Sequence, residues 1–342
     1  MTELRISRTE LTAAQISEVL ALVEAARLAD GVAPLSEHGM LHLRYDSASQ
    51  SGASQSGAGD FIVAVDGEIA GYAYLDPPSA QSDDGEVTGE LVVHPERRRR
   101  GAGRALTGEL AAAADGRVLR LWAHGDLPAA AALARAAGFD RFRALWQMRR
   151  SLAEPLDQAV LPAGLTLRTF VPGQDEDGWL SLNGRAFAKH PEQGGWTRHD
   201  LELREREPWF DPAGFFIAER DGQMAGFHWT KVHDSATGGV RGGRFPRGGR
   251  GDGSPRDKET QQSLGEVYVV GVDPAGQGSG LGRALTLAGL QHLRDLGVAQ
   301  AMLYVDEDNA PAIRMYEALG FTRATVDAMY RRMTSAGDRT GP

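Results

Sequence analysis

The 342-residue chain contains no cysteine. Disulfides, thiolate catalysis and cysteine-rich zinc sites are therefore excluded. The N-terminal sequence, MTELRISRTELTAAQ, has no apolar core segment, so we expect neither a signal peptide nor a membrane anchor and predict a cytoplasmic protein. The histidines His190, His199, His228 and His233 show neither H-x-x-x-H nor H-E-x-x-H spacing, and no metal site is predicted.

Positive charge is in the minority. The chain has 37 lysine and arginine residues against 46 aspartate and glutamate residues, which gives a net charge of −9. This balance argues against general binding to nucleic acid or to an anionic membrane. A content of 42% hydrophobic and 24% charged residues is typical of a globular protein, and the length is sufficient for two domains with separate cores.

Glycine is abundant in residues 266–285, which read EVYVVGVDPAGQGSGLGRAL. The apolar run predicts a buried strand over 267–272, and the glycines predict a loop that opens a helix near Leu281. Unpaired backbone N–H groups in such a loop and in the first helical turn point in one direction, where the helix dipole adds positive charge. The stretch therefore predicts a cradle for a pyrophosphate.

The same pattern occurs in the first half, at residues 91–106, which read LVVHPERRRRGAGRAL. Pro95 and Gly101 recur as Pro274 and Gly280, each 179 residues later (274 − 95 and 280 − 101). A Gly-Phe-x-Arg sequence follows each loop, and its two copies are 182 residues apart (320 − 138). The chain is therefore a tandem duplication of one domain.

Each half reads β-α-α-β-β-β-α-β-α-β, which predicts an α/β domain with a mixed sheet. The predicted domains are 1–153 and 163–342, joined by a short linker at 154–162.

Two further features of the chain bear on its loops. Asp-Gly dipeptides at 66–67 and 221–222 predict a tight hairpin turn in each half. A Gly/Arg-rich insertion at 235–263 separates Lys231 from Glu266. It is interpreted either as a disordered, length-tolerant loop or as a positive loop that assists an anionic ligand.

Two loop patterns compete for the glycine-rich stretch, G-x-G-x-x-G of dinucleotide-binding folds and Q/R-x-x-G-x-G/A of the GNAT acetyltransferases. Gln277, Gly280 and Gly282 fit the second, and no Gly-Lys-Ser/Thr follows. The phrases PLSEHGMLHLR, RAFAKHPEQGGWT, EPWFDPAGFF, FHWTKVH and GEVYVVGVDP together resemble the mycothiol synthase family, and the resemblance covers nearly the whole chain. It implies two tandem GNAT domains that transfer acetyl from acetyl-CoA to the cysteinyl amine of cysteinyl-glucosaminyl-inositol, the last step of mycothiol biosynthesis.

Acetyl transfer from a thioester to an amine needs a neutral amine, a stabilised oxyanion and a proton for the departing thiolate. Tyr316, five residues after Pro311, stands where GNAT enzymes hold a tyrosine near the CoA sulfur, and it is the predicted general acid. The alternative is a core tyrosine that faces the sheet. Glu266 begins the central strand and is the predicted base, acting directly or through water. Its alternatives are a solvated strand-end carboxylate without this role, or a base among the carboxylates at 306–308.

The duplication provides an internal control. With offsets of 182 and 179, the first-half counterparts of Tyr316, Asn309 and Glu266 are Ala134, Leu127 and Val87. The first domain has kept the phosphate loop and lost the candidate acid, asparagine and base, so it is predicted to be non-catalytic. Because backbone amides make the cradle, it remains a candidate for binding CoA. Its arginines 97–100 are interpreted either as contacts to CoA phosphates or as a solvated basic loop.

The resemblance also implies which residues bind ligands. Those for the substrate are Glu37, Glu192, Lys231, Glu266 and Tyr304. Those for acetyl-CoA in the second domain are Val270, Gly271, Val272, Gln277, Gly278, Ser279, Gly280, Leu281, Gly282, Arg283, Asn309, Ala310, Pro311, Ala312, Ile313 and Arg314, and the corresponding first-domain set is Leu91, Val92, Val93, Arg99, Arg100, Gly101, Ala102, Gly103 and Arg104. Because Glu37 is the counterpart of Glu192 in the repeat, a pocket shared between the domains is expected. Plainer alternatives stay open, namely an exposed helix-start glutamate, a surface lysine and an aromatic filling residue at 37, 231 and 304.

The expected partner is a small thiol precursor, with no nucleic acid or membrane, and the expected state is a monomer. Two other functions stay open. One is a tandem GNAT N-acetyltransferase for another small amine or a protein N-terminus, and the other is a CoA-binding sensor without catalysis.

Overall fold

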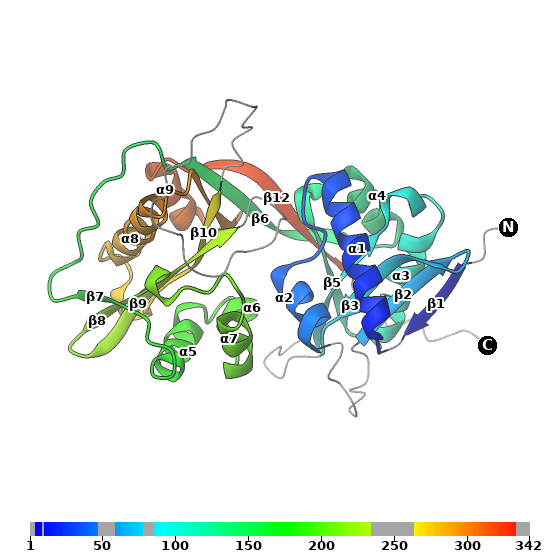
Figure 1. Ribbon diagram of the computed structural model, residues 1–342, viewed down its shortest axis with the longest axis horizontal. Coiled ribbons are helices and arrows are strands. Elements are labelled where there is room, and N and C mark those ends of the chain that lie inside the picture. Colours follow the sequence, from blue (N-terminus) through cyan, green and yellow to red (C-terminus); the bar gives the residue numbers. More distant parts are fainter. Residues whose placement is uncertain (1–3, 9, 47–58, 78–84, 234–262, 333–342) are drawn as a thin grey trace, which may run out of the picture. The chain divides into compact units, whose positions relative to one another are not determined.

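The computed structural model describes residues 4–8, 10–46, 59–77, 85–233 and 263–332 (Figure 1). The chain divides into two compact units. Unit 1 comprises Met1–Leu145 and Thr325–Pro342, and unit 2 comprises Trp146–Ala324. The Gly/Arg-rich insertion, except for Ser263, lies outside the described residues.

In unit 1 the strands follow the order β1-β2-β3-β4-β5-β12. Neighbouring strands are antiparallel except for β4 and β5, which are parallel. The strands are β1 (Leu4–Arg8), β2 (Gly59–Val65), β3 (Glu68–Leu75), β4 (Glu86–Val93), β5 (Val118–Ala123) and β12 (Thr322–Arg332), and the helices are α1 (Ala13–Asp30), α2 (Glu37–Leu41), α3 (Ala102–Ala113) and α4 (Pro128–Ala136).

The sheet of unit 1 is covered on both faces because its strands alternate between two cores. On β2, Phe61 and Val63 pack in one core with Leu106 of α3, whereas Ile62 between them packs in another core with Leu22 of α1. Successive side chains of a strand point to opposite faces, so the two cores lie on opposite sides of the sheet. Helices α1 and α2 therefore cover one face, and α3 and α4 cover the other.

In unit 2 the strands follow the order β6-β11-β10-β9-β8-β7. The parallel pair is β10 and β11, while β9 is antiparallel to both β10 and β8. The strands are β6 (Asp140–Ser151), β7 (Thr166–Thr169), β8 (Phe215–Arg220), β9 (Gln223–His233), β10 (Leu264–Val272) and β11 (Gln300–Asp306), and the helices are α5 (Glu176–Ala186), α6 (Pro191–Gly194), α7 (Arg198–Glu205), α8 (Leu281–Asp295) and α9 (Ala310–Ala318).

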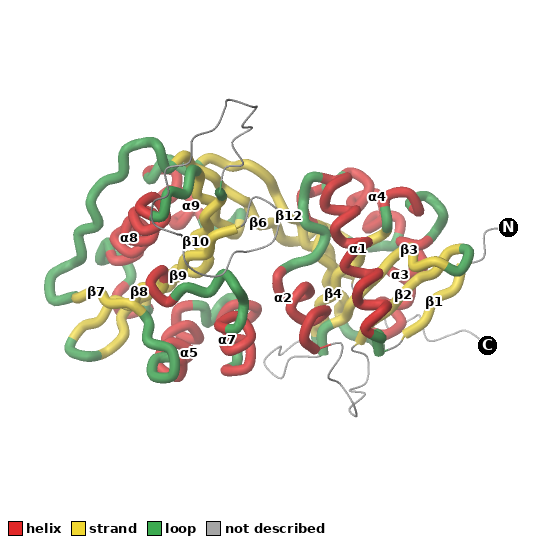
Figure 2. The backbone as a smooth tube through the Cα atoms, viewed as in Figure 1, coloured by secondary structure: helices red, strands yellow, loops and turns green. Residues whose placement is uncertain are grey.

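Unit 2 also has a helical layer on each side of its sheet (Figure 2). Trp179 of α5 and Leu201 of α7 pack with Trp229 of β9 in an aromatic core. Leu290 of α8 and Tyr316 of α9 pack in a separate core that includes β10 and β11. The two units thus repeat the same arrangement, as the duplication of the sequence predicts.

Both predicted hairpin turns are confirmed. Asp66 and Gly67 join β2 to β3 with φ angles of 54° and 88°, and Asp221 and Gly222 join β8 to β9 with φ angles of 51° and 75°. Positive φ at both central residues is the geometry that matches the twist of an antiparallel pair, and Asp-Gly adopts it at little cost.

The compact units do not coincide with the predicted domains 1–153 and 163–342, because each repeat places the end of its last strand in the other unit. In unit 1, β12 pairs with β5 from Ala328↔Ala123 to Arg332↔Leu119. In unit 2, Met148 of β6 is part of the core that contains Leu303 of β11. The sequence repeat identifies these strands but not their neighbours, since strand pairing is a long-range property.

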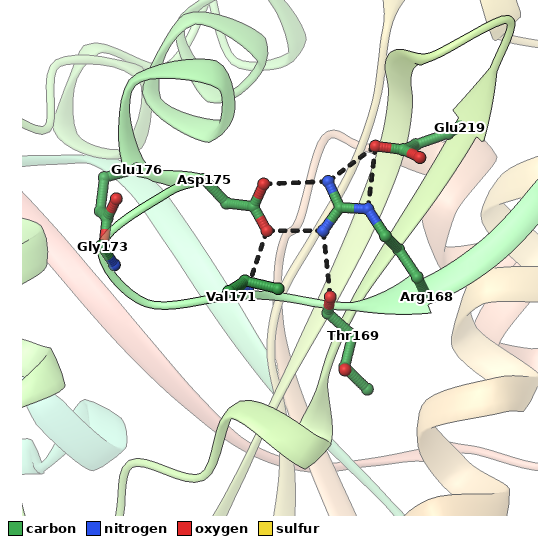
Figure 3. Close-up of polar contacts among 7 residues, drawn as sticks. All are labelled: Arg168, Thr169, Val171, Gly173, Asp175, Glu176 and Glu219. Atoms are coloured by element: carbon green, nitrogen blue, oxygen red, sulfur yellow. Dashed lines mark hydrogen bonds and ion pairs between the residues drawn. The ribbon is translucent and has the colours of Figure 1, made fainter.

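An arginine clamp holds the edge strand of unit 2 (Figure 3). The guanidinium of Arg168 on β7 donates to both carboxylate oxygens of Asp175 at 2.5 and 2.9 Å and to one oxygen of Glu219 on β8 at 2.6 and 2.9 Å. Asp175 also accepts from the N–H of Val171 at 2.7 Å. Paired bonds from a planar guanidinium fix orientation as well as distance, so β7 is tied both to β8 and to the segment that enters α5.

Candidate functional site

The loop after β10 has the conformation that its glycines predict. Asp273 accepts the N–H of Ala275 and an Nε hydrogen bond from Arg185 at 2.8 Å, and these two donors lower the pKa of its carboxyl. Gly278 and Gly280 then take φ angles of 78° and 87°, in the left-handed region that favours glycine. The loop thereby turns directly into α8 at Leu281.

The N-cap residue of α8 is Gly280, which has no side chain to cap the helix, while the N–H of Leu281 donates to Oγ of Ser279 at 3.4 Å. By contrast, the side chains of Thr12 and Thr197 cap α1 and α7 in capping boxes. The loop residues 277–280 are exposed. The first-turn N–H groups of a helix with a glycine N-cap, together with the helix dipole, favour a negatively charged ligand at this end. The arrangement can therefore hold a phosphate or pyrophosphate.

The loop of unit 1 has the same backbone. Arg98 and Gln277 are both extended, with φ and ψ of −64° and 161° in the first and −63° and 147° in the second. Gly101 has φ of 90° and precedes α3 without a capping side chain. Arg99 has φ of 63° where unit 2 has Gly278. A non-glycine residue in this region is strained, so the loop keeps its shape here against the local preference of the chain.

The four arginines of this loop have different environments. Arg98 donates two bonds to Asp30 at 2.6 and 2.7 Å and one to the carbonyl of Val93 at 3.1 Å. Arg97 forms an ion pair with Glu68. Arg98 is therefore committed to holding the loop against α1 and β4, while Arg99, Arg100 and Arg104 are exposed.

The ladder between β10 and β11 ends before the strands do. Pairing runs from Leu264↔Gln300 to Val267↔Leu303, and residues 270–272 lie beyond the last pair. On the other side these residues remain paired with β9, from Val270↔His228 to Val272↔Gly226. The β11-facing edge of 270–272 lies outside the ladder, and such an edge can pair with an extended ligand as a strand would.

The same interruption occurs in unit 1. There β4 and β5 pair from Glu86↔Val118 to Gly89↔Leu121, and Leu91, Val92 and Val93 lie beyond. In both units the strand runs on from this edge into the glycine-rich loop, so the edge and the cradle are consecutive along the chain.

Glu266 is a buried carboxylate, with 7% of the residue exposed. It lies directly opposite Lys231, which is 6% exposed. The two residues therefore pair between β9 and β10 although a long insertion separates them in the sequence. The Nε2 atom of His233 lies 2.7 Å from Oε2 of Glu266. The burial excludes the interpretation of Glu266 as a solvated strand-end residue. It does not by itself assign the role of base.

A β-bulge beside Glu266 shapes one side of the site. The register between β9 and β10 shifts between Val267 and Val269, which leaves Tyr268 as the extra residue. Nζ of Lys231 lies 5.1 Å from the ring centre of Tyr268 and 4.5 Å from that of Trp209. The faces of aromatic rings attract an ammonium group, so these two rings help to position the side chain of Lys231 beside Glu266.

Tyr316 lies on α9 with 6% of the residue exposed. Its ring packs edge-on to Phe321 at 5.8 Å between centroids, in the core that contains Val267. Burial raises the pKa of its hydroxyl well above the usual value, so the phenol stays protonated at neutral pH. The ring is thus part of the core, and the protonated hydroxyl is in the form that a general acid requires.

The helix that carries Tyr316 begins with a cap that the first half lacks. The side chain of Asn309 accepts the N–H of Ala312 at 3.2 Å, whereas Leu127 at the start of α4 provides no capping side chain. Pro311, in the first turn, favours the helical φ. The residues of the predicted CoA set from Ala310 to Ile313 therefore form a properly capped helix start in unit 2.

Tyr304 on β11 is 42% exposed, and the amide of Gln147 donates to its hydroxyl at 2.9 Å. Arg149 in turn donates to the amide oxygen of Gln147 at 2.8 Å. Gln147 belongs to β6, the exchanged strand from the first repeat. An exposed and hydrogen-bonded Tyr304 does not fit the interpretation as aromatic filling.

The remaining predicted residues are placed as follows. Glu37 begins α2 in unit 1, after the N-cap Ser36. The side chain of Glu192 lies outside the part of the chain that the structure describes. Among the rival carboxylates, Glu307 and Asp308 are exposed and Asp306 lies 3.5 Å from Nδ1 of His190.

Sequence reasoning missed two partners of the site, His233 and Gln147. The alternation of side chains along β9 was a signal for His233, since it lies two residues beyond Lys231 and therefore on the same face. No local signal identifies Gln147, because its strand enters unit 2 from the first repeat.

The structure describes no metal centre. Within the described ranges, no three His, Asp or Glu side chains are grouped so as to hold a metal ion. His38 and His42 have the i, i+4 spacing of metal ligands, but Nε2 of His38 lies 2.8 Å from Asp76 and Nε2 of His42 lies 3.1 Å from Asp60. The two imidazoles are engaged by different carboxylates.

Comparisons with known proteins place both halves in one family. Residues 184–321 match the acetyltransferase (GNAT) family, and residues 57–141 match an acetyltransferase (GNAT) domain. The chain is 55% identical to the mycothiol acetyltransferase of Thermomonospora curvata, over 94% of this chain and 95% of that protein, and 57% identical to that of Thermobispora bispora, over 92% and 95%.

Solved structures share the fold. A tandem GNAT protein from the clavulanic acid biosynthesis pathway has a TM-score of 0.64 at 22% identity, with 96% of this chain and 98% of that chain covered. A GCN5-related N-acetyltransferase from Sphaerobacter thermophilus has a TM-score of 0.63 at 21% identity, with coverages of 96% and 95%. The predicted fold of two tandem GNAT domains is confirmed.

Proposed function

The chain belongs to the mycothiol acetyltransferase family of tandem GNAT proteins, and on this premise we propose that it transfers acetyl from acetyl-CoA to the cysteinyl amine of cysteinyl-glucosaminyl-inositol, the last step of mycothiol biosynthesis. The observation that carries the reaction is the surroundings of β10. A buried carboxylate, Glu266, stands beside the last β10–β11 pair, the open edge follows it, and the N-terminus of α8, with Gly280 as its N-cap, comes next.

Acetyl-CoA is bound along this path. The loop 277–283 and the start of α8 hold the pyrophosphate through backbone N–H groups, and the edge 270–272 pairs with the amides of the pantetheine arm. N–H groups on the same edge supply donors for the thioester oxygen as it becomes an oxyanion. Residues 309–314, at the start of α9, make the remaining contacts to acetyl-CoA. No protein carboxylate or metal is needed for these contacts.

Glu266 accepts a proton from the amine, and Tyr316 donates one to the departing thiolate. The amine nitrogen forms a bond to the carbonyl carbon, the carbon–sulfur bond breaks, and the sulfur takes the phenolic proton. Water then returns a proton to the Tyr316 phenolate. Burial of the carboxylate limits competition from water, and burial of the phenol keeps it protonated until the thiolate forms.

The acceptor is held by Glu37, Glu192, Lys231, Glu266 and Tyr304. Carboxylates and an ammonium suit a ligand that carries an amine and many hydroxyls.

The two repeats differ in activity. The second domain, 163–342, is catalytic, and the first, 1–153, is not. The counterparts of the acid and the base in the first domain are Ala134 and Val87, and Val87 is buried in its core. The loop and open edge of unit 1 retain the geometry for holding CoA through residues 91–93 and 99–104.

The protein works in the cytoplasm as a monomer, with a small thiol precursor as its partner. None of the helices within the described residues is long and apolar enough to cross a membrane.

Replacing Gln147 by leucine is expected to raise the KM for the acceptor about 2- to 12-fold with little change in kcat. The variant loses the hydrogen bond that orients the Tyr304 hydroxyl, and one such bond is worth about 0.5–1.5 kcal/mol. Steady-state kinetics with the acceptor varied measures the effect. Gln291→Leu, whose amide bonds the carbonyl of Asp157, is the control. An unchanged KM would show that the hydrogen bond from Gln147 does not affect binding of the acceptor by Tyr304.

The function is tested by release of CoA from acetyl-CoA, with cysteinyl-glucosaminyl-inositol beside a panel of other amines. Turnover selective for the cysteinyl conjugate is expected. Tyr316→Phe should lower kcat by about 10²-fold or more, because it removes the acid and keeps the packing of the ring. Tyr330→Phe, at a buried tyrosine in the core of unit 1, is the control and should keep full activity. Preference for another amine, or binding of acetyl-CoA without any turnover, would overturn the proposed substrate or the proposed reaction.

A further inference from the structure

The carboxylate assigned as base has a direct protein partner. His233 is the last residue of β9, and its Nε2 atom lies 2.7 Å from Oε2 of Glu266 on β10. The register explains the contact. Lys231 is opposite Glu266 and His233 is opposite Leu264, so the imidazole is the diagonal neighbour of the carboxylate on one face of the sheet. The antiparallel pairing itself fixes this geometry.

The two side chains differ in their access to solvent. The Glu266 side chain is 9% exposed, and the His233 side chain is 25% exposed. A proton that reaches the carboxylate is therefore largely shielded from water, whereas a proton on the imidazole has access to it. Because the exposure increases from Glu266 to His233, a proton that passes from the carboxylate to the imidazole moves toward solvent.

The overall reaction has one proton to dispose of. An ammonium acceptor carries three protons. One stays on the amide nitrogen, one ends on the thiol sulfur, and one must leave to solvent. A buried carboxylate that had kept its proton would be unable to act as the base in the next cycle, so Glu266 needs a route for proton release.

We propose that His233 is the relay that returns Glu266 to its ionised form. The inference rests on the proposed function in that it takes Glu266 as the base. Oε2 of protonated Glu266 gives its proton to Nε2 of neutral His233, and Nδ1 of the resulting imidazolium gives a proton to water. No bond other than N–H and O–H changes, and no co-reactant is needed.

The side-chain chemistry selects histidine for this step. A neutral imidazole accepts a proton on one nitrogen and releases one from the other, which no other side chain does near neutral pH. Lys231, the other titratable residue on this face of β9 near Glu266, has no acceptor site as an ammonium.

The first repeat lacks the carboxylate that the relay serves. The counterpart of Glu266 is Val87, which is buried in the core of unit 1. The half that is proposed to be inactive therefore has no base to return to its ionised form.

The test compares His233→Gln, which keeps a hydrogen-bond donor to Glu266 but cannot carry a proton through, with His233→Ala. We expect both to lose about 10²-fold in kcat with the KM for acetyl-CoA unchanged. Imidazole added to the buffer should restore a large part of the kcat of His233→Ala and leave wild type unaffected. His199→Ala, at an exposed position on α7, is the control and should behave as wild type.

Two results would overturn the relay. Full kcat in His233→Gln would mean that the contact only orients the carboxylate, and an absence of imidazole rescue in His233→Ala would mean that the lost function is not proton transfer. These assays use as acceptor the amine that the wild-type protein acetylates in the panel described under the proposed function. A wrong acceptor therefore counts against the proposed substrate, whereas full activity in Glu266→Gln counts against the base and with it the relay.

Discussion

Glu266→Gln is expected to lower kcat by about 10²- to 10⁴-fold, the range for loss of a positioned proton-transfer group. Glutamine keeps the shape of the side chain and can still bond His233, so the β9–β10 ladder and the bulge at Tyr268 remain. Only the ability to take the amine proton is removed. The KM for acetyl-CoA should stay near the wild-type value, because the cradle consists of backbone groups on a different segment. Measurement of kcat and both KM values separates these effects.

A matched substitution checks that the loss is specific to the site. Glu317 is exposed on α9, one residue after Tyr316, and Glu317→Gln should keep wild-type kcat. If Glu266→Gln turned over at the wild-type rate, one of the carboxylates at 306–308 would have to take the role of base. Among these Asp306, with its contact to His190, would be substituted next.

His124→Leu is expected to destabilise unit 1 by about 3–5 kcal/mol, the cost of removing one partner from a buried ion pair. Nδ1 of His124 lies 2.9 Å from Asp327 and Nε2 lies 3.2 Å from Glu90, and all three side chains are largely buried. Only a doubly protonated ring donates to two carboxylates. Leucine would leave both carboxylates buried without this cation. Hydrogen exchange of peptides from β4, β5 and β12 measures the opening free energy.

The same histidine makes the stability depend on pH. Burial alone would lower the pKa of His124, but the bonds to Asp327 and Glu90 outweigh it and raise the pKa to about 10, against an ordinary value of 6.5. The stabilisation is fully present below pH 6.5. It falls by about 1.4 kcal/mol per pH unit as the pH rises toward 10, since only the folded state then holds the proton.

Urea unfolding at about pH 7 and pH 9 checks this dependence. The stability difference between wild type and His124→Leu should shrink at the higher pH, and His199→Leu, at an exposed site, should show no such change. A difference that is the same at both pH values would mean that His124 is not held as an imidazolium in the folded state.

Several features of the site were predictable because they depend on residues close together in the chain. The positive φ of Gly280 and Gly101 and the helix that follows each of them are local properties of the glycine-rich loops. The Asp-Gly turns are local in the same sense. The candidate base and acid were predicted from Glu266 at the start of the central strand and from Tyr316 five residues after Pro311, although the sequence alone left open whether either was buried.

Other features depended on partners far away in the sequence. The four arginines of residues 97–100 look alike in the chain, yet Arg98 is tied to Asp30 at a separation of 68 residues. The role proposed for His233 depends on its contact with Glu266, which lies 33 residues later in the sequence, beyond the long insertion. The bulge that displaces Tyr268 follows from the pairing of β9 with β10 and has no mark in the sequence of β10 itself.

The sequence by itself determined that the chain is a duplicated GNAT protein with a glycine-rich loop in each half and with the candidate acid and base in one half only. Repeats, glycine-rich loops and residue types can be identified in the sequence without knowledge of spatial neighbours. The tertiary structure alone decided that each repeat places the end of its last strand in the other unit, so that Asp327 reaches His124 across 203 residues and Gln147 reaches Tyr304 across 157. Strand neighbours are chosen by packing over the whole sheet, and the repeated strands β6 and β12 carry no local signal for which unit they will join.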